Sequence, residues 1–159
     1  ILLRNHGLAN RDEVACFGYN SRLDSLQAVV GNHLIEQFDE ITASRIRHAG
    51  LVDAGLADVP QITIPPRKAD HRYVYHLYIV FAEDRDGLLA HLQAAGIEAK
   101  IHYPIPLHLQ ECCRNMGHSE GDFPHTEAQA RSMITLPVHQ HVTAEQVDYV
   151  IEQVRAYYA

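Results

Sequence analysis

The feature that most constrains the fold is a long stripe of apolar residues with helical spacing in the first third of the chain. The stripe recurs in steps of three and four residues and comprises Leu23, Leu26, Val30, Leu34, Phe38 and Ile41. This spacing is typical of one face of an amphipathic helix, and further apolar residues extend it to about Gly55. Asp24 or Ser21 is placed to cap the first turn. We therefore predict one long or once-broken helix over residues 23–56, which bridges two domains or packs against a partner subunit.

The remainder of the chain alternates between strand and helix patterns. The expected elements are strands at 62–64, 73–81, 97–101 and 134–136, and helices at 84–96, 109–116, 126–133 and from 143 onward. Asp84 is a suitable N-cap, Gly96 is placed to end its helix at C′, and Thr143 with Gln146 forms a capping box. The pattern predicts an α+β domain over residues 57–159, with few strands and with helices on one face of the sheet.

A short segment, residues 101–108, combines stiffness with polar side chains. Pro104 and Pro106 fix their own φ angles and hold the residues before them extended, which excludes a helix. His102, Tyr103 and His108 stand on this backbone. Hydrogen-bonding groups on a rigid segment suit a binding surface better than a core, so we expect this segment to contact a polar ligand.

Composition excludes several classes of function. The net charge of −7 argues against general nucleic-acid binding and against an anionic membrane surface. The sequence has no run of about eighteen apolar residues that would span a membrane. The three cysteines are odd in number and two are adjacent, which favours a reducing cytoplasm over a disulfide framework. The chain begins at Ile1 in the middle of a pattern, so we expect a fragment of a longer protein.

Candidate chemistry is sparse when the residues are taken alone. Five histidines are conceivable metal ligands: His76, His102, His108, His139 and His141. No HExxH or paired CxxC motif accompanies them, so we expect no metal site. GxSxG and glycine-rich phosphate loops are absent. Asn20 and Arg22, in a polar loop ahead of a helix, suit either a phosphate or carboxylate site or a turn and cap.

Several segments together resemble the DegT/DnrJ/EryC1/StrS family, the pyridoxal-phosphate (PLP)-dependent sugar aminotransferases. Residues 18–28 resemble the family's GxNxRxDxxQA segment, and residues 102–108 resemble its HYPxPxH motif. Arg4-Asn5-His6-Gly7, Gly121-Asp122-Phe123-Pro124 with Glu127, and Leu136-Pro137 follow the family's order and approximate spacing. The resemblance covers nearly the whole chain and rests on five motifs in order.

The resemblance implies the aspartate aminotransferase fold (fold type I), of which this chain is the C-terminal part. Residues 1–22 would be a remnant of the large cofactor-binding domain, 23–56 a linking helix, and 57–159 the small domain. The family's Schiff-base lysine lies before the Arg4 motif, and neither Lys68 nor Lys100 has a matching context. The chain alone is therefore expected to be inactive.

The resemblance also assigns residues and partners. Asn20 would reach the cofactor phosphate of the neighbouring subunit, and Arg22, also assigned to cofactor binding, would lie near the substrate or that phosphate. His102, Tyr103 and His108 would line the substrate site. The intact protein would be a cytoplasmic homodimer with shared active sites, transferring an amino group from glutamate to a nucleotide-linked keto-sugar. Two alternatives stay open: a stand-alone module that binds a sugar nucleotide or a protein without catalysis, and a PLP-dependent sugar dehydratase of the same family.

Overall fold

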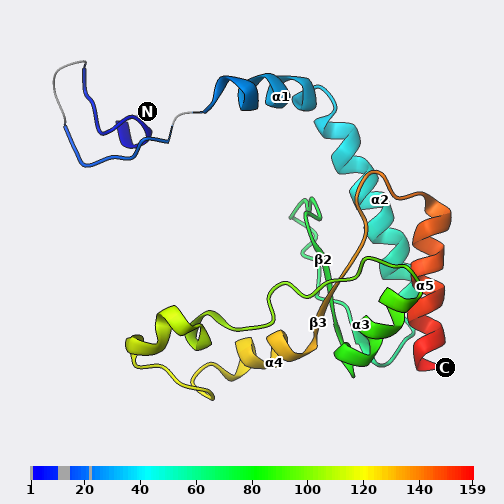
Figure 1. Cartoon of the computed structure of the whole chain (residues 1–159). Coiled ribbons are helices and arrows are strands. Elements are labelled where there is room, and N and C mark those ends of the chain that lie inside the picture. Colours follow the sequence, from blue (N-terminus) through cyan, green and yellow to red (C-terminus); the bar gives the residue numbers. More distant parts are fainter. Residues whose placement is uncertain (1, 11–14, 22) are drawn as a thin grey trace. The chain divides into compact units, whose positions relative to one another are not determined.

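The computed structural model describes residues 2–10, 15–21 and 23–159 (Figure 1). The chain divides into two compact units, Ile1–Asp39 and Glu40–Ala159. Among the described residues, no helix is both long enough and apolar enough to cross a membrane.

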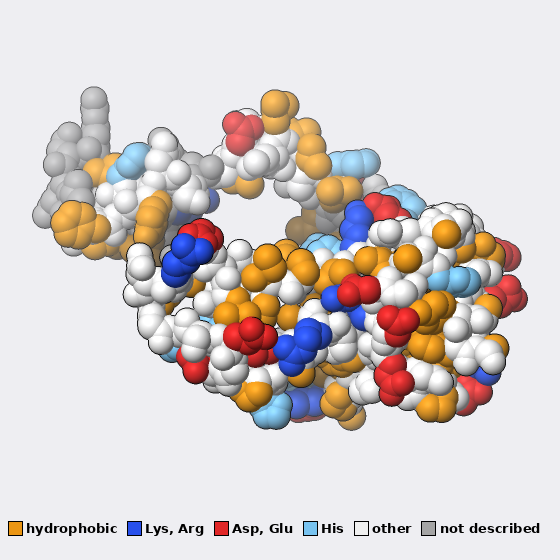
Figure 2. Space-filling view, turned by 60° about the horizontal axis from the view of Figure 1, so that its bottom comes forward, with side chains coloured by type: hydrophobic (Ala, Val, Ile, Leu, Met, Phe, Trp, Pro, Cys, Tyr) orange, Lys and Arg blue, Asp and Glu red, His pale blue; other side chains and the backbone are white. Residues whose placement is uncertain are grey.

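The first unit contains the 3-10 helix η1 (Leu2–Arg4) and helix α1 (Ser25–Ile35). The Asp24 side chain caps α1 by accepting the Leu26 N–H at 2.8 Å, as predicted. No residue of α1 is buried, so the apolar stripe lies at the surface, and Leu26 is 78% exposed. The space-filling view shows hydrophobic side chains at the molecular surface among polar ones (Figure 2).

The helix predicted over residues 23–56 has the once-broken form. Helix α1 ends at Ile35, and α2 runs over Phe38–Leu56. Between them the Gln37 N–H bonds to the carbonyl of Leu34, three residues back, at 3.0 Å. This tighter turn interrupts the regular four-residue pattern and starts a new helix.

An antiparallel sheet in the order β1-β2-β3 is the centre of the second unit. Its strands are β1 (Ile62–Thr63), β2 (Tyr78–Ala82) and β3 (Met133–Leu136), with Ile62 opposite Ala82 and Tyr78 opposite Leu136. Strand β2 is shorter than the predicted 73–81, because Tyr75 has a φ of 48°, which lies outside the extended range of a strand. The Arg67 guanidinium lies 5.8 Å from the ring of Tyr73 and 5.4 Å from that of Tyr75. The predicted strand at 97–101 is reduced to one bridge.

The helices of the second unit largely follow the sequence signals. They are α3 (Arg85–Ala94), α4 (Pro124–Ser132) and α5 (Ala144–Tyr158), with 3-10 turns η2 (Leu107–Leu109) and η3 (Glu111–Met116). Asp84 caps α3 by accepting the Gly87 N–H, and Thr143 and Gln146 form the predicted capping box of α5. Gly96 follows the C-cap of α3 with φ of 76°, the left-handed conformation expected at C′.

The hydrophobic core lies between the sheet and helices α2, α3 and α5, which gather on one side of it in Figure 1. Alternate residues of β2 are buried, as a strand with one covered face requires. The largest fully buried side chains are Tyr78, Leu56, Leu88, Leu92, Ile134, Leu136, Val52, Val80, Val147 and Val154. A small mixed domain with segregated helices and strands confirms the predicted α+β class.

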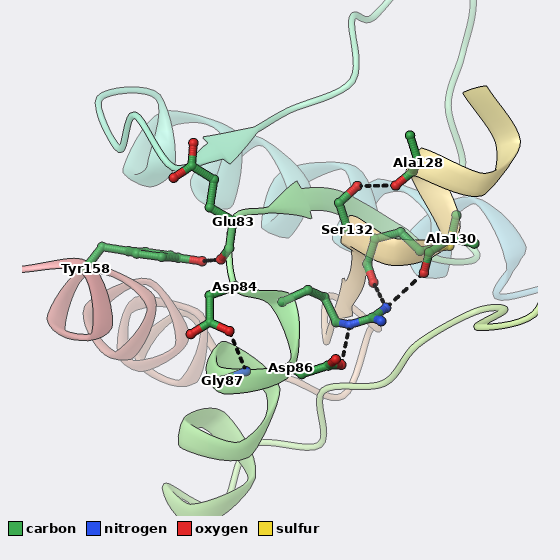
Figure 3. A network of polar contacts seen from close by, with 10 residues as sticks. Glu83, Asp84, Asp86, Gly87, Ala128, Ala130, Ser132 and Tyr158 are labelled. Atoms are coloured by element: carbon green, nitrogen blue, oxygen red, sulfur yellow. Dashed lines mark hydrogen bonds and ion pairs between the residues drawn. The ribbon is translucent and has the colours of Figure 1, made fainter. Parts of the chain in front are cut away.

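A polar network joins α3 to the start of β3 (Figure 3). Arg85 Nη1 donates to the carbonyls of Ala130 and Met133, both at 3.1 Å, and its Nε donates to Asp86 at 2.7 Å. The Tyr158 hydroxyl donates to the carbonyl of Glu83. The Arg85 contacts hold the end of α4 against the core, and with it the loop that precedes α4.

Candidate functional site

The segment predicted to form a binding surface begins at the edge of the sheet. Lys100 and Thr135 form an isolated antiparallel bridge, with N–H to carbonyl distances of 3.2 and 2.8 Å. Residues 101–106 then contain no helix or strand, as the two prolines predict. The peptide bond between His102 and Tyr103 is cis. The chain turns into η2 at Leu107, after Pro106.

His102 is fixed by the neighbouring strand. Its Nδ1 lies 2.9 Å from the hydroxyl oxygen of Thr135, which is buried on β3. The hydroxyl donates or accepts in this bond according to the histidine tautomer. In both cases Nε2 is the ring nitrogen that stays available to a ligand, and the ring orientation is set before a ligand arrives.

A cleft of about 680 Å³ opens beside His102, and its volume suits a small-molecule ligand. Polar residues of its lining include Arg45, His76, Glu98, Lys100, His139 and His141, in addition to His102 and Thr135. Arg45 is held by its donor groups: Nε bonds to Gln140 at 3.2 Å, and Nη1 bonds to the Tyr75 carbonyl at 3.0 Å. The cleft therefore offers one fixed guanidinium and several imidazoles.

The histidines of the cleft differ in their surroundings. Burial lowers the pKa of His139, and the nearby His141 and Arg45 lower it further. The His139 imidazole is therefore neutral near pH 7. Its backbone carbonyl lies 3.3 Å from Nδ1 of the buried His48, which joins α2 to this loop. His139 suits hydrogen bonding to an uncharged hydroxyl better than pairing with an anion.

Tyr103 has a different setting from His102. It is 73% exposed and does not line the cleft. Several apolar side chains of the same loop are also exposed: Ile105, Leu107, Leu109, Met116 and Phe123. The loop thus presents an apolar surface next to the tyrosine hydroxyl, an arrangement that suits a ligand with both a polar and an apolar part.

His108 lies inside the loop rather than at its surface. Its side chain is 8% exposed, and Nε2 lies 3.0 Å from Oε1 of Glu127. The ring centroids of His108 and Phe123 are 4.7 Å apart. This setting leaves little of the imidazole for a ligand, and its predicted substrate contact stays a prediction.

Glu127 collects several donors. Its carboxylate accepts the Gly121 N–H at 2.9 Å and the Phe123 N–H at 3.3 Å, in addition to His108. Burial by itself raises the pKa of Glu127, but the bonds from Gly121, His108 and Phe123 outweigh it and hold the pKa below its ordinary value. The side chain is therefore an anion at neutral pH.

The predicted cofactor residues lie in the first unit. Asn20 is exposed, and its backbone forms an isolated bridge with Asn5, which shapes the loop before α1. The backbone N–H of Ser21 bonds to the carbonyl of Arg4 at 2.9 Å. Arg22 lies outside the described residues. The structure therefore places an exposed amide at position 20, and the two cofactor roles stay predictions.

The two lysines have ordinary surface settings. Lys68 is exposed, and Lys100 Nζ pairs with Glu98 at 2.5 Å, with its own side chain 56% exposed. Neither lies in a buried pocket of the kind that activates an amine. Within the residues that the structure describes, no three His, Cys, Asp or Glu side chains cluster in a way that would hold a metal ion.

Sequence reasoning gave no role to three residues that organise the site, although the family resemblance included Glu127. Thr135 anchors His102, Arg45 lines the cleft, and Glu127 joins the two ends of the loop. Only Glu127 had a signal, since it follows Phe123-Pro124 at the first turn of α4. Thr135 lies 33 positions along the chain from His102, and Arg45 lies 95 positions from Gln140. No local sequence pattern reveals contacts over such separations.

Comparison with characterised proteins bears on the nature of this site. A pleiotropic regulatory protein of Geobacillus stearothermophilus is 35% identical over 99% of this chain and 43% of its own length. The dTDP-3-amino-3,4,6-trideoxy-alpha-D-glucose transaminase of Streptomyces venezuelae is 36% identical over 97% of this chain and 41% of its own length. The chain thus spans well under half the length of these relatives.

Solved structures match the fold closely. The crystal structure of S. venezuelae DesV in complex with a ketimine intermediate has a TM-score of 0.92 and 36% identity, covering 99% of this chain and 42% of that one. An aminotransferase from Brucella abortus has a TM-score of 0.88 and 29% identity, with the same coverage of each chain. The profile of the DegT/DnrJ/EryC1/StrS aminotransferase family matches residues 1–155. The chain belongs to this family.

Proposed function

We propose that this chain is the C-terminal part of a PLP-dependent aminotransferase that transfers an amino group to the keto group of a nucleotide-linked sugar. The match of the family profile over residues 1–155 is the observation that carries the proposal. Relatives named as transaminases of dTDP-linked sugars and as an aminotransferase of a UDP-linked sugar support the substrate class. The polar cleft beside His102 agrees with a hydroxylated ligand.

The residues of the first unit fit a phosphate-bearing cofactor. The exposed Asn20 amide is a hydrogen-bond donor in the polar loop that precedes α1. We assign Asn20 and Arg22 to the phosphate of pyridoxal phosphate. When bound, the cofactor supplies the electron sink for amino transfer. The roles of this chain are to hold that phosphate and to orient the sugar.

In the second unit, His102 and Tyr103 are the proposed direct contacts with the sugar nucleotide. His102 presents Nε2, because Nδ1 is engaged by Thr135. Tyr103 presents an exposed hydroxyl on a segment that two prolines make rigid. Our sequence prediction adds His108 to this set, although its imidazole faces Glu127.

The chain alone should not catalyse the reaction. Amino transfer needs a lysine that binds the cofactor and moves protons at the substrate carbon. Lys68 and Lys100 are exposed, and Lys100 is paired with Glu98. We assign the catalytic lysine to the part of the parent protein that this chain lacks. We also propose glutamate as the amino donor, a homodimer with shared active sites, and a cytoplasmic location.

The intact gene product should be tested with glutamate and a panel of dTDP- and UDP-linked keto-sugars, with 2-oxoglutarate formation as the readout. Turnover of at least one keto-sugar with release of 2-oxoglutarate would support the proposal. Loss of a sugar hydroxyl without amino transfer would instead identify a dehydratase. Binding of a sugar nucleotide without either reaction would identify a non-catalytic module.

A further inference from the structure

Glu127 is the one carboxylate that is buried among the described residues. It is 5% exposed, whereas the other described aspartates and glutamates are half-buried or exposed. Removing a charged carboxylate from water is costly unless hydrogen bonds replace the lost hydration. Here the hydration is replaced by His108 and by the N–H groups of Gly121 and Phe123, and removing the carboxylate would leave these donors without their acceptor. The carboxylate therefore fixes the position of the groups that it bonds.

The carboxylate joins two separate parts of one loop. Oε1 of Glu127 lies 3.0 Å from His108 Nε2, and the same carboxylate accepts the N–H groups of Gly121 and Phe123. His108 belongs to the η2 turn, immediately after the rigid His-Pro segment. Gly121 has φ of 96°, so its backbone adopts a turn that presents its N–H to the carboxylate. The Glu127 carboxylate thus bonds to both parts of the loop at once, through the His108 side chain and through two backbone N–H groups.

The loop held in this way carries the proposed ligand contacts at its start. Thr135 fixes His102 from the strand side, and Glu127 fixes His108 from the helix side. Tyr103 lies between these two anchors and is exposed. Arg85 in turn bonds to the end of α4, so the element that carries Glu127 is itself attached to the core.

We propose that Glu127 and His108 form a positioning pair for nucleotide-sugar recognition, and that His108 acts through the loop rather than by touching the ligand. This inference rests on the proposed function. The pair fixes the segment from His102 to His108, so that Nε2 of His102 and the hydroxyl of Tyr103 are preorganised for the ligand. Preorganisation of this kind lowers the entropy lost on binding.

The test uses the intact parent enzyme with its cofactor and compares Glu127→Gln with Glu120→Gln. Glu120 is exposed and adjacent to Gly121, so its substitution makes the same change in charge near the same loop. For Glu127→Gln we expect KM for the nucleotide sugar to rise on the order of tenfold to a hundredfold, with kcat within about threefold of wild type. KM for the amino donor and all constants of Glu120→Gln should stay unchanged.

The variant His108→Asn separates positioning from direct contact. If the two residues act as a pair, this variant raises KM like Glu127→Gln, and the double variant is no worse than Glu127→Gln alone. Additive losses, or a larger loss in His108→Asn than in Glu127→Gln, would show that His108 binds the ligand itself and would overturn the inference. An unchanged KM in Glu127→Gln would overturn it as well.

Two further measurements distinguish a failure of the positioning role from a failure of the proposed function. Hydrogen exchange at the Gly121 and Phe123 amides should accelerate in Glu127→Gln but not in Glu120→Gln, whatever reaction the enzyme catalyses. Unchanged exchange would refute the role of Glu127 in holding this part of the loop. If Glu127→Gln does not fold, His108→Asn keeps the carboxylate bonded to both amides and supplies the same KM readout. Absence of turnover in the wild type would refute the proposed function instead, and the exchange result would still test the pair.

Discussion

Replacing Tyr78 by phenylalanine should destabilise the second unit by a predictable amount. The Tyr78 hydroxyl donates to Asp53 Oδ1 at 2.6 Å, and the side chain is 1% exposed. Burial, reinforced by Asp53, raises the pKa of Tyr78 far above its ordinary value, so the group stays a donor. A hydrogen bond to a charged acceptor contributes about 1.5–3 kcal/mol. Asp53 is partly exposed and keeps Arg67 at 3.7 Å, which places the expected loss at about 1.5–2 kcal/mol.

Urea unfolding measures this loss. The chain contains no tryptophan, so circular dichroism at a helix band is the suitable signal. With an m value of about 2 kcal/mol/M, the midpoint for Tyr78→Phe should fall by roughly 0.7–1 M. Tyr149→Phe is the matched control, because its hydroxyl bonds to the neutral carbonyl of Ala95 at 3.2 Å on an exposed side chain. That control should lose less than about 0.5 kcal/mol. Equal midpoints for the two variants would refute the reasoning.

Three other outcomes are expected of the 159-residue chain. The folded pKa of Glu127 lies below its unfolded value of 4.5, so its contribution is complete above pH 4.5 and is lost as pH falls through the folded value. Glu127→Gln should therefore flatten the acid side of a plot of unfolding free energy against pH, whereas an unchanged slope would contradict this assignment. Incubation with pyridoxal phosphate and borohydride should leave no stoichiometric adduct on Lys68 or Lys100 in mass spectra; a defined adduct on Lys100 would count against the missing-lysine argument. The exposed stripe of α1 should promote self-association, measured by sedimentation and weakened by Leu26→Glu, and a wild-type chain that stays monomeric at high concentration would exclude this.

Local signals in the sequence predicted the ends of elements well. Asp24, Asp84, Gly96 and Thr143 each cap or end a helix as predicted, because capping depends on neighbours within a few residues. The sequence left open whether the long helix is continuous or broken, because the apolar spacing continues across residues 36 and 37. In the structure, the N–H groups of Glu36 and Gln37 both bond to the carbonyl of Leu34 at the break.

Tertiary contacts limited the remaining predictions. The strand pattern at 73–81 has suitable residues throughout, but Tyr75 adopts a positive φ of 48°, with its ring 5.4 Å from the Arg67 guanidinium, and β2 begins only at Tyr78. The candidate site shows the same limit. His102 was identifiable from its motif, whereas its anchor Thr135 was not, because the contact joins residues far apart in the chain.

The two prolines of the His-Pro segment have a second consequence, at the boundary of the sheet. Beyond β3 the sheet continues only as the single bridge between Lys100 and Thr135, and Pro104 and Pro106 follow within a few residues. Proline has no N–H to donate, so positions 104 and 106 cannot continue the pairing along this margin. On the opposite margin, β1 has only two residues and offers a very short template. The residues that stiffen the loop thus also mark the point where strand pairing ends at this margin of the sheet.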